Sequence, residues 1–270
     1  NQQDIWKINP MIRRDKTNYV IQSVAHSLDV LEQFFGEADE LGVTELSKRL
    51  KLHKNNVFRL LATLEARGYI EQNRASENYR LGIKCLQLGR RYIEHMGLVR
   101  QARPILADIS RKARESAFVA IARRDGVVPL EAAEPDDRVV RITPPIGQTL
   151  PLHCTAIGKA HLAFDPEEQL QTSLPEQLER FTSRTIIERG ALLEQLHCIA
   201  SEGYSVEVGE YFEDVASIAV PIRDYTRSVV GSLAVAGPCY RIPADRIRNE
   251  LAPLIVEAGR ELSYRLGYNE

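Results

Sequence analysis

The segment from Pro144 to Phe164, PPIGQTLPLHCTAIGKAHLAF, contains the side chains that come closest to forming a chemical site. His153, Cys154 and His161 are residue types that bind metals, and a Cys beside a His can act as a nucleophile. Their spacing fits no standard zinc pattern, and adjacent side chains such as those of His153 and Cys154 rarely point at each other. We therefore expect no metal centre, no catalytic nucleophile and no cofactor.

The same segment contains the start of a predicted helix. Thr155 is placed to cap this helix, and Ala156, Ile157 and Gly158 follow with free backbone N–H groups. A helix start of this kind attracts a carboxylate or a similar anion, which favours a ligand-binding site. Alternatively, Gly158 and Ala160 are small only because the helix packs tightly against a sheet. The residues alone leave both interpretations open.

A second stretch with chemical potential is HKNNVFRLLATLEARGYIE, residues 53–71. Its apolar residues have helical spacing and predict one packed stripe, made of Val57, Leu60, Leu61 and Leu64. The face left over carries Lys54, Asn55, Asn56 and Arg59. Asn pairs with adenine edges and Arg with guanine edges, at about 1 to 3 kcal/mol of discrimination per bidentate contact. This face is therefore typical of a helix that lies in the major groove of DNA.

The elements around this helix predict a winged helix-turn-helix. A first helix is expected to pack through one apolar stripe, made of Val24, Leu28, Leu31 and Phe35. Thr44 is the expected N-cap of the second helix, and Gly68 is expected to end the third. The predicted order is helices over residues 23–35, 44–50 and 54–67, with a tight turn at 51–53, then strands over 69–72 and 78–82. In such a unit the third helix enters the major groove.

Basic residues outnumber acidic ones between Thr44 and Lys84, although the whole chain has a formal net charge of −2 and a pI near 6.4. A local basic patch neutralises phosphates, so binding through it should weaken as salt rises. The side chains expected to contact DNA are Thr44, Lys54, Asn55, Asn56, Arg59 and Arg74. Basic helix faces are often only solvated, and a winged helix can also bind another protein, so that alternative stays open.

The second half of the chain predicts an α+β domain with an antiparallel sheet. A helix over residues 83–97 precedes another that contains Pro104, which requires a local kink or a helix start at that proline. Strands are expected in FVAIARR, VVPLEAAE, RVVRIT, EGYSVEVGEYF, VASIAVPIRD and SVVGSLAVAGP, with a turn at Asp125 and Gly126. Helices over residues 188–203 and 244–267 are expected to flank this sheet.

Length and composition are consistent with a two-domain cytoplasmic protein. The 270 residues are enough for two cores, and the four cysteines form no CxxC pair, which suits reduced thiols. The sequence has no apolar run of about 18 residues and no signal-peptide pattern. Residues 1–18 mix one proline, Pro10, with several charges, lack periodicity and predict a mobile arm that could touch DNA phosphates.

These motifs together resemble the IclR family of bacterial transcription regulators, from about Tyr19 to Leu266. The resemblance is carried by IQSVAHSLDVLEQF, GVTELSKRLKLHKNNVFRLLATLEARGYIEQ, YRLG, LPLHCTAIGKAHLA, VASIAVPIRD and SVVGSLAVAGP. It implies a winged helix-turn-helix over residues 19–82, a linker helix over 83–97 and a GAF-like effector domain over 98–270. It also implies dimers or tetramers on palindromic operators, acting as repressor or activator under the control of a small organic acid or aromatic compound.

The resemblance also implies where the effector binds. The family's pocket maps onto Ala156, Ile157, Ser217, Ala234 and Ala236, and less securely onto Glu207; Cys154, Thr155 and Gly158 flank it in the same segment. Some relatives have hydroxyl side chains where this chain has Ala234 and Ala236, so the pocket is expected to be less polar here. We expect an acid with an apolar or aromatic body. A rival hypothesis makes the second domain a hydrolase with Cys154 as its nucleophile.

Overall fold

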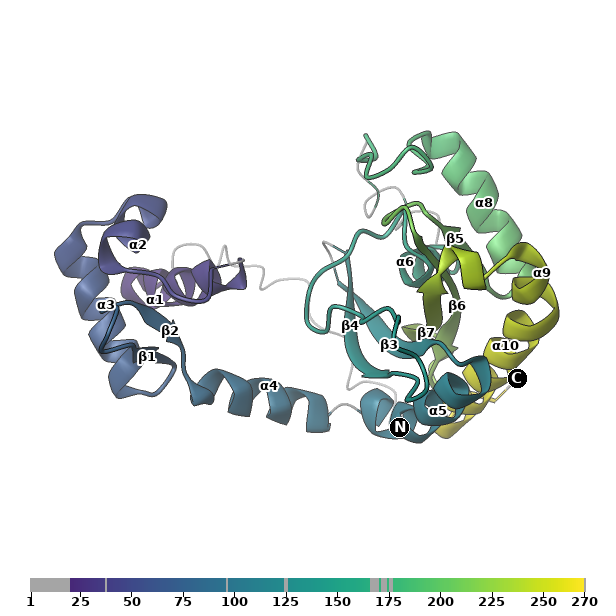
Figure 1. Cartoon of the computed structure of the whole chain (residues 1–270), viewed down its shortest axis with the longest axis horizontal. Coiled ribbons are helices and arrows are strands. Elements are labelled where there is room, and N and C mark those ends of the chain that lie inside the picture. Colours follow the sequence, from purple (N-terminus) through teal and green to yellow (C-terminus); the bar gives the residue numbers. More distant parts are fainter. Residues whose placement is uncertain are drawn as a thin grey trace, which may run out of the picture. The chain divides into compact units, whose positions relative to one another are not determined.

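The computed structural model describes residues 20–36, 38–95, 97–123, 126–165, 170, 174 and 177–269. The expected N-terminal arm, residues 1–18, lies outside them, as does Asp125 of the predicted turn. The chain divides into two compact units, Asn1–Tyr92 and Ile93–Glu270, which are described separately (Figure 1). Among the described residues, no helix is long and apolar enough to cross a membrane.

The N-terminal unit is a winged helix-turn-helix, as the sequence predicts. Its elements are α1 (Gln22–Glu32), a 3-10 turn (Gln33–Phe35), α2 (Val43–Leu50), α3 (Lys54–Ala66), β1 (Ile70–Gln72) and β2 (Tyr79–Leu81). Lys51 adopts a left-handed conformation with φ of 55° and makes the tight turn between α2 and α3. Gly68, with φ of 77°, redirects the chain from α3 into the hairpin. Leu41 adds a single bridge to Tyr79 at the edge of this small sheet.

Two predictions for this unit are wrong in detail. Of the predicted stripe only Leu31 packs, partly buried; Val24, Leu28 and Phe35 are exposed, and the main contacts come from Val30 of α1 and Phe34 of the 3-10 turn. Apolar residues occupy two faces of α1, and both pairs, Val24–Leu28 and Val30–Phe34, have helical spacing, so periodicity could not identify the packed face. The N-cap of α2 is Gly42 without a side-chain bond, so Thr44 lies inside the first turn with its side chain exposed.

Two further helices follow, α4 (Ile83–His95) and α5 (Gly97–Ala113). The second contains Pro104 in its interior, so the alternative that a helix starts at this proline is wrong. Pro104 has no N–H to donate to the carbonyl of Arg100, and the helix continues without that bond. Packing of α5 compensates for this missing hydrogen bond, because the helix buries residues along its whole length, from Leu98 to Ala113.

The C-terminal unit is built on a five-stranded antiparallel sheet in the order β4-β3-β7-β6-β5. The strands are β3 (Ser116–Arg123), β4 (Gly126–Ala133), β5 (Ser205–Val208), β6 (Val215–Arg223) and β7 (Val229–Pro238). Besides α5, the helices among its described residues are α6 (Ala156–Leu162), α8 (Arg189–Glu202), α9 (Ala244–Arg246) and α10 (Ala252–Arg265), with a π-helical segment at Ile247–Leu251 (Figure 1). The predicted α+β class with an antiparallel sheet is confirmed.

Side-chain size differs between the two faces of this sheet. Because side chains alternate along a strand, Leu233 and Val235 of β7 pack with α5 and α10 on one face. Ala234 and Ala236 point to the other face, toward α6. Ala120 of β3 and Ala219 of β6 lie on that face too. The alanine face leaves room for α6 to approach closely and for a pocket beside it.

The strand predicted in RVVRIT, residues 138–143, is absent. Within the part of the chain that the structure describes, this run forms no strand: Val139 is 97% exposed and Val140 is 57% exposed, and only Ile142 packs, beside the second core cluster. The adjacent sheet edge is β4, and it is occupied at Val127 by Leu150, with two backbone hydrogen bonds of 2.8 Å. Alternation of residue types predicts a strand only where a free edge is available, and the sequence does not show that.

Candidate functional site

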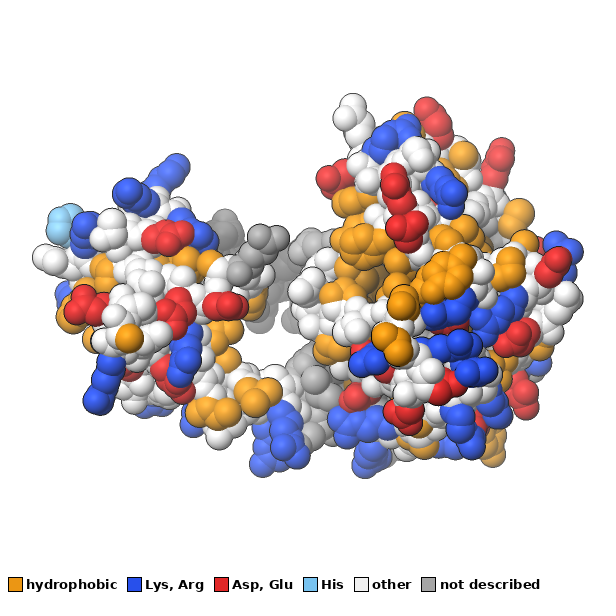
Figure 2. Space-filling view, viewed as in Figure 1, with side chains coloured by type: hydrophobic (Ala, Val, Ile, Leu, Met, Phe, Trp, Pro, Cys, Tyr) orange, Lys and Arg blue, Asp and Glu red, His pale blue; other side chains and the backbone are white. Residues whose placement is uncertain are grey.

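The exposed face of α3 is the first candidate site. His53 caps the helix, because its Nδ1 accepts a hydrogen bond from the amide of Asn55 over 3.3 Å. Val57, Leu61 and Leu64 hold the opposite face against the core of the unit. Lys54, Asn55, Asn56 and Arg59 are all exposed, as their positions outside the apolar stripe predicted. Figure 2 shows Lys and Arg side chains gathered over α2 and α3 in this unit.

The other two predicted contact residues, Thr44 in α2 and Arg74 in the turn of the hairpin, are also exposed. Other basic side chains of this unit are paired with acids, as Arg49 is with Glu45 and Arg80 with Glu71. Within the described residues, Lys54, Arg59 and Arg74 have no acidic partner. Their charges are therefore free for phosphate or base contacts.

Sequence reasoning missed one residue of this surface. Phe58 lies on α3 and is 56% exposed, although it is large and apolar. The sequence could have indicated this exposure, because the position of Phe58 in the helix lies outside the stripe of Val57, Leu61 and Leu64 that packs against the core.

The second candidate site is a small pocket beside α6, with a free volume of about 60 Å³. Six of the predicted effector residues line it: Thr155, Ala156, Ile157, Glu207, Ser217 and Ala236. The other three, Cys154, Gly158 and Ala234, are buried nearby without lining it. Sequence reasoning missed the remaining walls, which are Phe118, Ile142, Pro144, Pro145, Leu150, Tyr211, Phe212 and Val215. The pocket is therefore mainly apolar.

Two strands and a capped helix shape the polar end of this pocket. Ser217 of β6 lies directly opposite Ala236 of β7 in the sheet. Thr155 is the N-cap of α6 as predicted: its Oγ1 accepts from the amide of Gly158 over 3.2 Å and donates to the carbonyl of Pro151 over 2.6 Å. The Thr155 hydroxyl proton is thus already used, so a ligand that needs a hydrogen-bond donor must find it on another group of the pocket.

Gly158 has a packing role. A Cβ at this position would lie 2.3 Å from the carbonyl oxygen of Leu152, which is far inside van der Waals contact. The glycine therefore lets α6 fold back against its own preceding loop. The packing interpretation holds for Gly158, although the neighbour is that loop and not the sheet.

Glu207 is the charged group that faces the pocket. Its Oε1 accepts hydrogen bonds from the amides of Glu210, at 2.7 Å, and Tyr211, at 3.3 Å, and its Oε2 accepts from Ser217 Oγ at 3.0 Å. Burial raises the pKa of Glu207 to about 7, although these three hydrogen bonds act in the opposite direction. Near neutral pH this carboxyl is therefore present in both protonation states.

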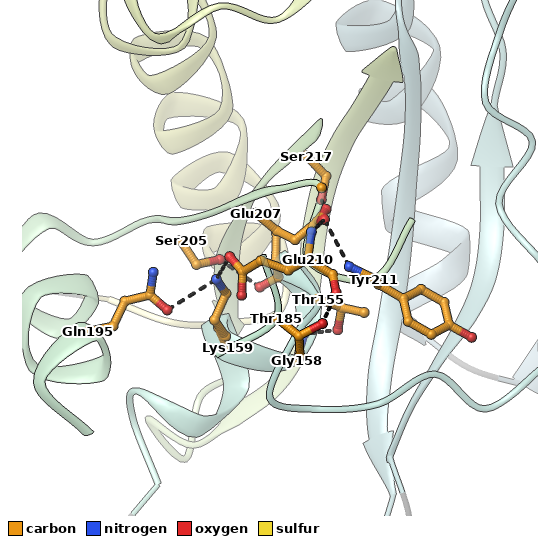
Figure 3. Close-up of polar contacts among 12 residues, drawn as sticks. Thr155, Gly158, Lys159, Thr185, Gln195, Ser205, Glu207, Glu210, Tyr211 and Ser217 are labelled. Atoms are coloured by element: carbon orange, nitrogen blue, oxygen red, sulfur yellow. Dashed lines mark hydrogen bonds and ion pairs between the residues drawn. The ribbon is translucent and has the colours of Figure 1, made fainter. Parts of the chain in front are cut away.

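A buried polar network continues behind Glu207 (Figure 3). Lys159 of α6 has no exposed surface, and its Nζ contacts Glu210 Oε1 at 2.6 Å and Gln195 Oε1 at 3.1 Å. Thr185 Oγ1 donates to the carbonyl of Glu210 over 2.7 Å. The loop that carries Tyr211 into the pocket wall is thus tied to α6, to α8 and to the segment before α8.

The residues first considered for chemistry are not activated. Burial, with the nearby carboxylates of Glu210 and Glu207, raises the pKa of the Cys154 thiol to about 12. His153 Nε2 lies 2.9 Å from the carbonyl of Glu179, and burial lowers the pKa of His161 to about 4. The described residues contain no group of three or more side chains able to hold a metal. Cys154 is therefore protonated at any physiological pH and is a poor nucleophile.

Comparison with known protein families matches both units. The description "IclR helix-turn-helix domain" matches residues 23–74, and "Bacterial transcriptional regulator IclR C-terminal" matches residues 90–264. The chain is 32% identical over 257 residues to the HTH-type transcriptional regulator KdgR of Escherichia coli K12, covering 95% of this chain and 97% of that relative. It is also 32% identical over 249 residues to the glycerol operon regulatory protein of Streptomyces coelicolor, covering 92% and 97%.

Solved structures show the same similarity. A transcriptional regulator from Rhodococcus sp. RHA1 superposes with a TM-score of 0.83 at 26% identity, covering 92% of this chain and 99% of that one. An IclR transcriptional regulator from Alicyclobacillus acidocaldarius gives a TM-score of 0.82, again at 26% identity, covering 92% and 100%. The relatives are named as transcriptional regulators and not as enzymes.

Proposed function

The chain belongs to the IclR family of bacterial transcriptional regulators, and we propose that it binds operator DNA in a sequence-specific manner under the control of a small effector. The observation that carries the proposal is the exposed face of α3, where Lys54, Asn55 and Arg59 stand away from the packed stripe. Asn56 lies beside them, Thr44 at the start of α2, and Arg74 at the tip of the hairpin.

We assign two roles to these residues in DNA binding, phosphate contact and base contact. Lys54 and Arg74 neutralise phosphates and fix the position of the unit, which gives a salt-dependent affinity. Asn55, Asn56 and Arg59 have the planar or forked groups that form paired hydrogen bonds with base edges. In this proposal residues 19–82 form the DNA-binding domain, 83–97 the linker helix, and 98–270 the GAF-like effector domain.

The effector is a small organic acid with an apolar or aromatic body, held in the pocket beside α6. The apolar walls suit such a body, and Ala234 and Ala236 offer no hydroxyl to a more polar ligand. The backbone amides at the start of α6 favour a carboxylate. Glu207 repels that carboxylate when ionised and donates a hydrogen bond to it when protonated, so acid binding is coupled to proton uptake.

Binding of the effector changes operator affinity by favouring one arrangement of two paired winged units over another. Two recognition helices that enter successive major-groove segments require at least a dimer, and a pair of dimers makes a tetramer. The direction of the response decides between a repressor and an activator. A regulator of this kind acts where the chromosome is, which places it in the cytoplasm.

The test of DNA binding uses the full chain and a random-sequence duplex library. Wild-type protein should enrich a defined sequence, and Arg59→Ala should weaken binding to it by about 5- to 100-fold, because one bidentate base contact is lost. Arg265→Ala, which removes an exposed arginine at the end of α10, is the matched control and should bind normally. Binding that is indifferent to both salt and Arg59 would favour a protein-interaction module instead.

The test of effector binding uses thermal unfolding in the presence of organic acids. An acid that binds the pocket should raise the melting temperature and change the affinity for the selected duplex. Ala236→Leu fills the pocket, so it should abolish both responses while DNA binding without ligand is retained. If the variant still responds to the same acid, the effector binds elsewhere.

A further inference from the structure

Phe58 is an exposed aromatic side chain on a surface that is otherwise polar. It is 56% exposed on α3, whereas the apolar side chains that hold this helix in place, Val57 and Leu61, are fully buried. Its neighbours on the helix surface are Lys54 one turn earlier and Ala62 one turn later, and both are exposed. Phe58 is therefore not part of the hydrophobic core that keeps α3 in place.

Helical geometry places Phe58 within the proposed DNA-contacting face. Each residue advances an α-helix by about 100°, so Phe58 lies about 40° from Lys54 and about 60° from Asn55. A duplex that reaches Asn55 and the positive charge of Lys54 also reaches the ring between them. Ala62 is too small to hold the duplex away, which allows close approach along this side of α3.

We propose that Phe58 is a specificity-determining residue that contacts the C5-methyl group of thymine in the major groove. This inference rests on the proposed DNA-binding function. Thymine is the base that presents an apolar group in the major groove, and an aromatic side chain is a partner suited to it. The contact removes apolar surface of both groups from water, and the hydrogen-bonding residues beside Phe58 cannot supply that preference.

The experiment compares thymine with deoxyuridine, which differs only by the missing methyl group. The duplex that full-length wild-type protein selects from a random library is remade with single thymine-to-deoxyuridine replacements, and each dissociation constant is measured. At the contacted position the wild type should lose affinity by about three- to fivefold, as expected for one buried methyl group. Phe58→Ala should bind the thymine duplex more weakly and should not distinguish it from the deoxyuridine duplex.

Two further variants make the outcome decisive. Phe58→Leu keeps an apolar contact and should retain part of the preference, whereas Phe35→Ala removes an exposed phenylalanine outside α3 and should behave as wild type. The inference is overturned if no replacement weakens the wild type, or if Phe58→Ala responds to the replacements as the wild type does. A wild-type protein that selects no sequence at all would instead refute the proposed DNA-binding function.

Discussion

Lys159 and Glu210 form a 2.6 Å ion pair inside the C-terminal unit, although 51 residues separate them in the sequence. Lys159 has no exposed surface, and Glu210 Oε2 is buried with no hydrogen-bond partner among the residues that the structure describes. Burying both charges is costly, and the pair is tolerated because each charge compensates the other. The pair joins α6, which begins at the pocket, to the loop whose next residue, Tyr211, forms a pocket wall.

Removing one member of this pair should strongly destabilise the protein. Lys159→Met leaves the Glu210 carboxylate buried without a counter-charge, which should lower the free energy of unfolding by about 3 to 5 kcal/mol in urea denaturation. Arg265→Met breaks an exposed pair with Glu261 and should cost less than about 1 kcal/mol. The double variant Lys159→Met, Glu210→Met should recover most of the loss. Equal effects of the two single variants would contradict this account of burial.

Two glycines in helices of the same unit should respond oppositely to alanine. Gly158→Ala places a methyl group 2.3 Å from the Leu152 carbonyl oxygen, so α6 must shift, and we expect a loss of roughly 2 kcal/mol or more. Gly190→Ala in α8 meets nothing within 4 Å and should stabilise by about 0.5 to 1 kcal/mol through helix propensity. Thermal unfolding of both variants measures the difference. A neutral Gly158→Ala variant would show that its close packing is dispensable.

The sequence predicted elements well where one local pattern was decisive. The α3 stripe, the Thr155 cap and the alternating strands β6 and β7 each follow from spacing or from capping chemistry within a few residues. The errors arose where the answer depends on a distant neighbour. Both faces of α1 carry apolar residues, and only the position of α3 decides that Val30 packs while Val24 does not. Residues 138–143 have strand-like alternation but form no strand, and the segment that bridges the neighbouring edge strand, β4, is Leu150 at Val127.

In the candidate pocket, too, local motifs could be predicted from the sequence and long-range contacts could not. Ala156, Ile157 and Ser217 could be proposed from motif resemblance, and they do line the cavity. The aromatic wall formed by Tyr211 and Phe212 could not, because the Lys159–Glu210 contact that ties this loop to α6 is long-range. One local signal was available, since a lysine between Gly158 and Ala160 in a short, otherwise uncharged helix implies a buried partner.

Cys154 should be chemically inert. Its pKa is raised to about 12 by burial and by the nearby carboxylates, so almost no thiolate exists at pH 8. In the folded protein, iodoacetamide should modify exposed Cys198 well before Cys154, as mass spectrometry of the digested protein can show. Cys154→Ala should also retain effector-dependent DNA binding. Rapid labelling of Cys154 in folded protein would revive the hydrolase hypothesis.

Glu207 should make stability depend on pH in a defined direction. Its pKa rises from 4.5 to about 7 on folding, so the native state holds a proton that the unfolded chain has lost between these values. The stabilisation is complete below about pH 4.5 and is lost as the pH rises through about 7.

Relative to Glu207→Gln, the wild type should lose on the order of 2 to 3 kcal/mol of unfolding free energy between pH 4.5 and pH 8. Urea denaturation of both proteins across this pH range measures the difference between their unfolding free energies. All other groups titrate alike in the wild type and the variant, so the change of this difference with pH comes from Glu207. A difference that stays constant with pH would mean that folding does not raise the pKa of Glu207, so its carboxyl would be ionised near neutral pH and an acid effector would have to overcome its charge.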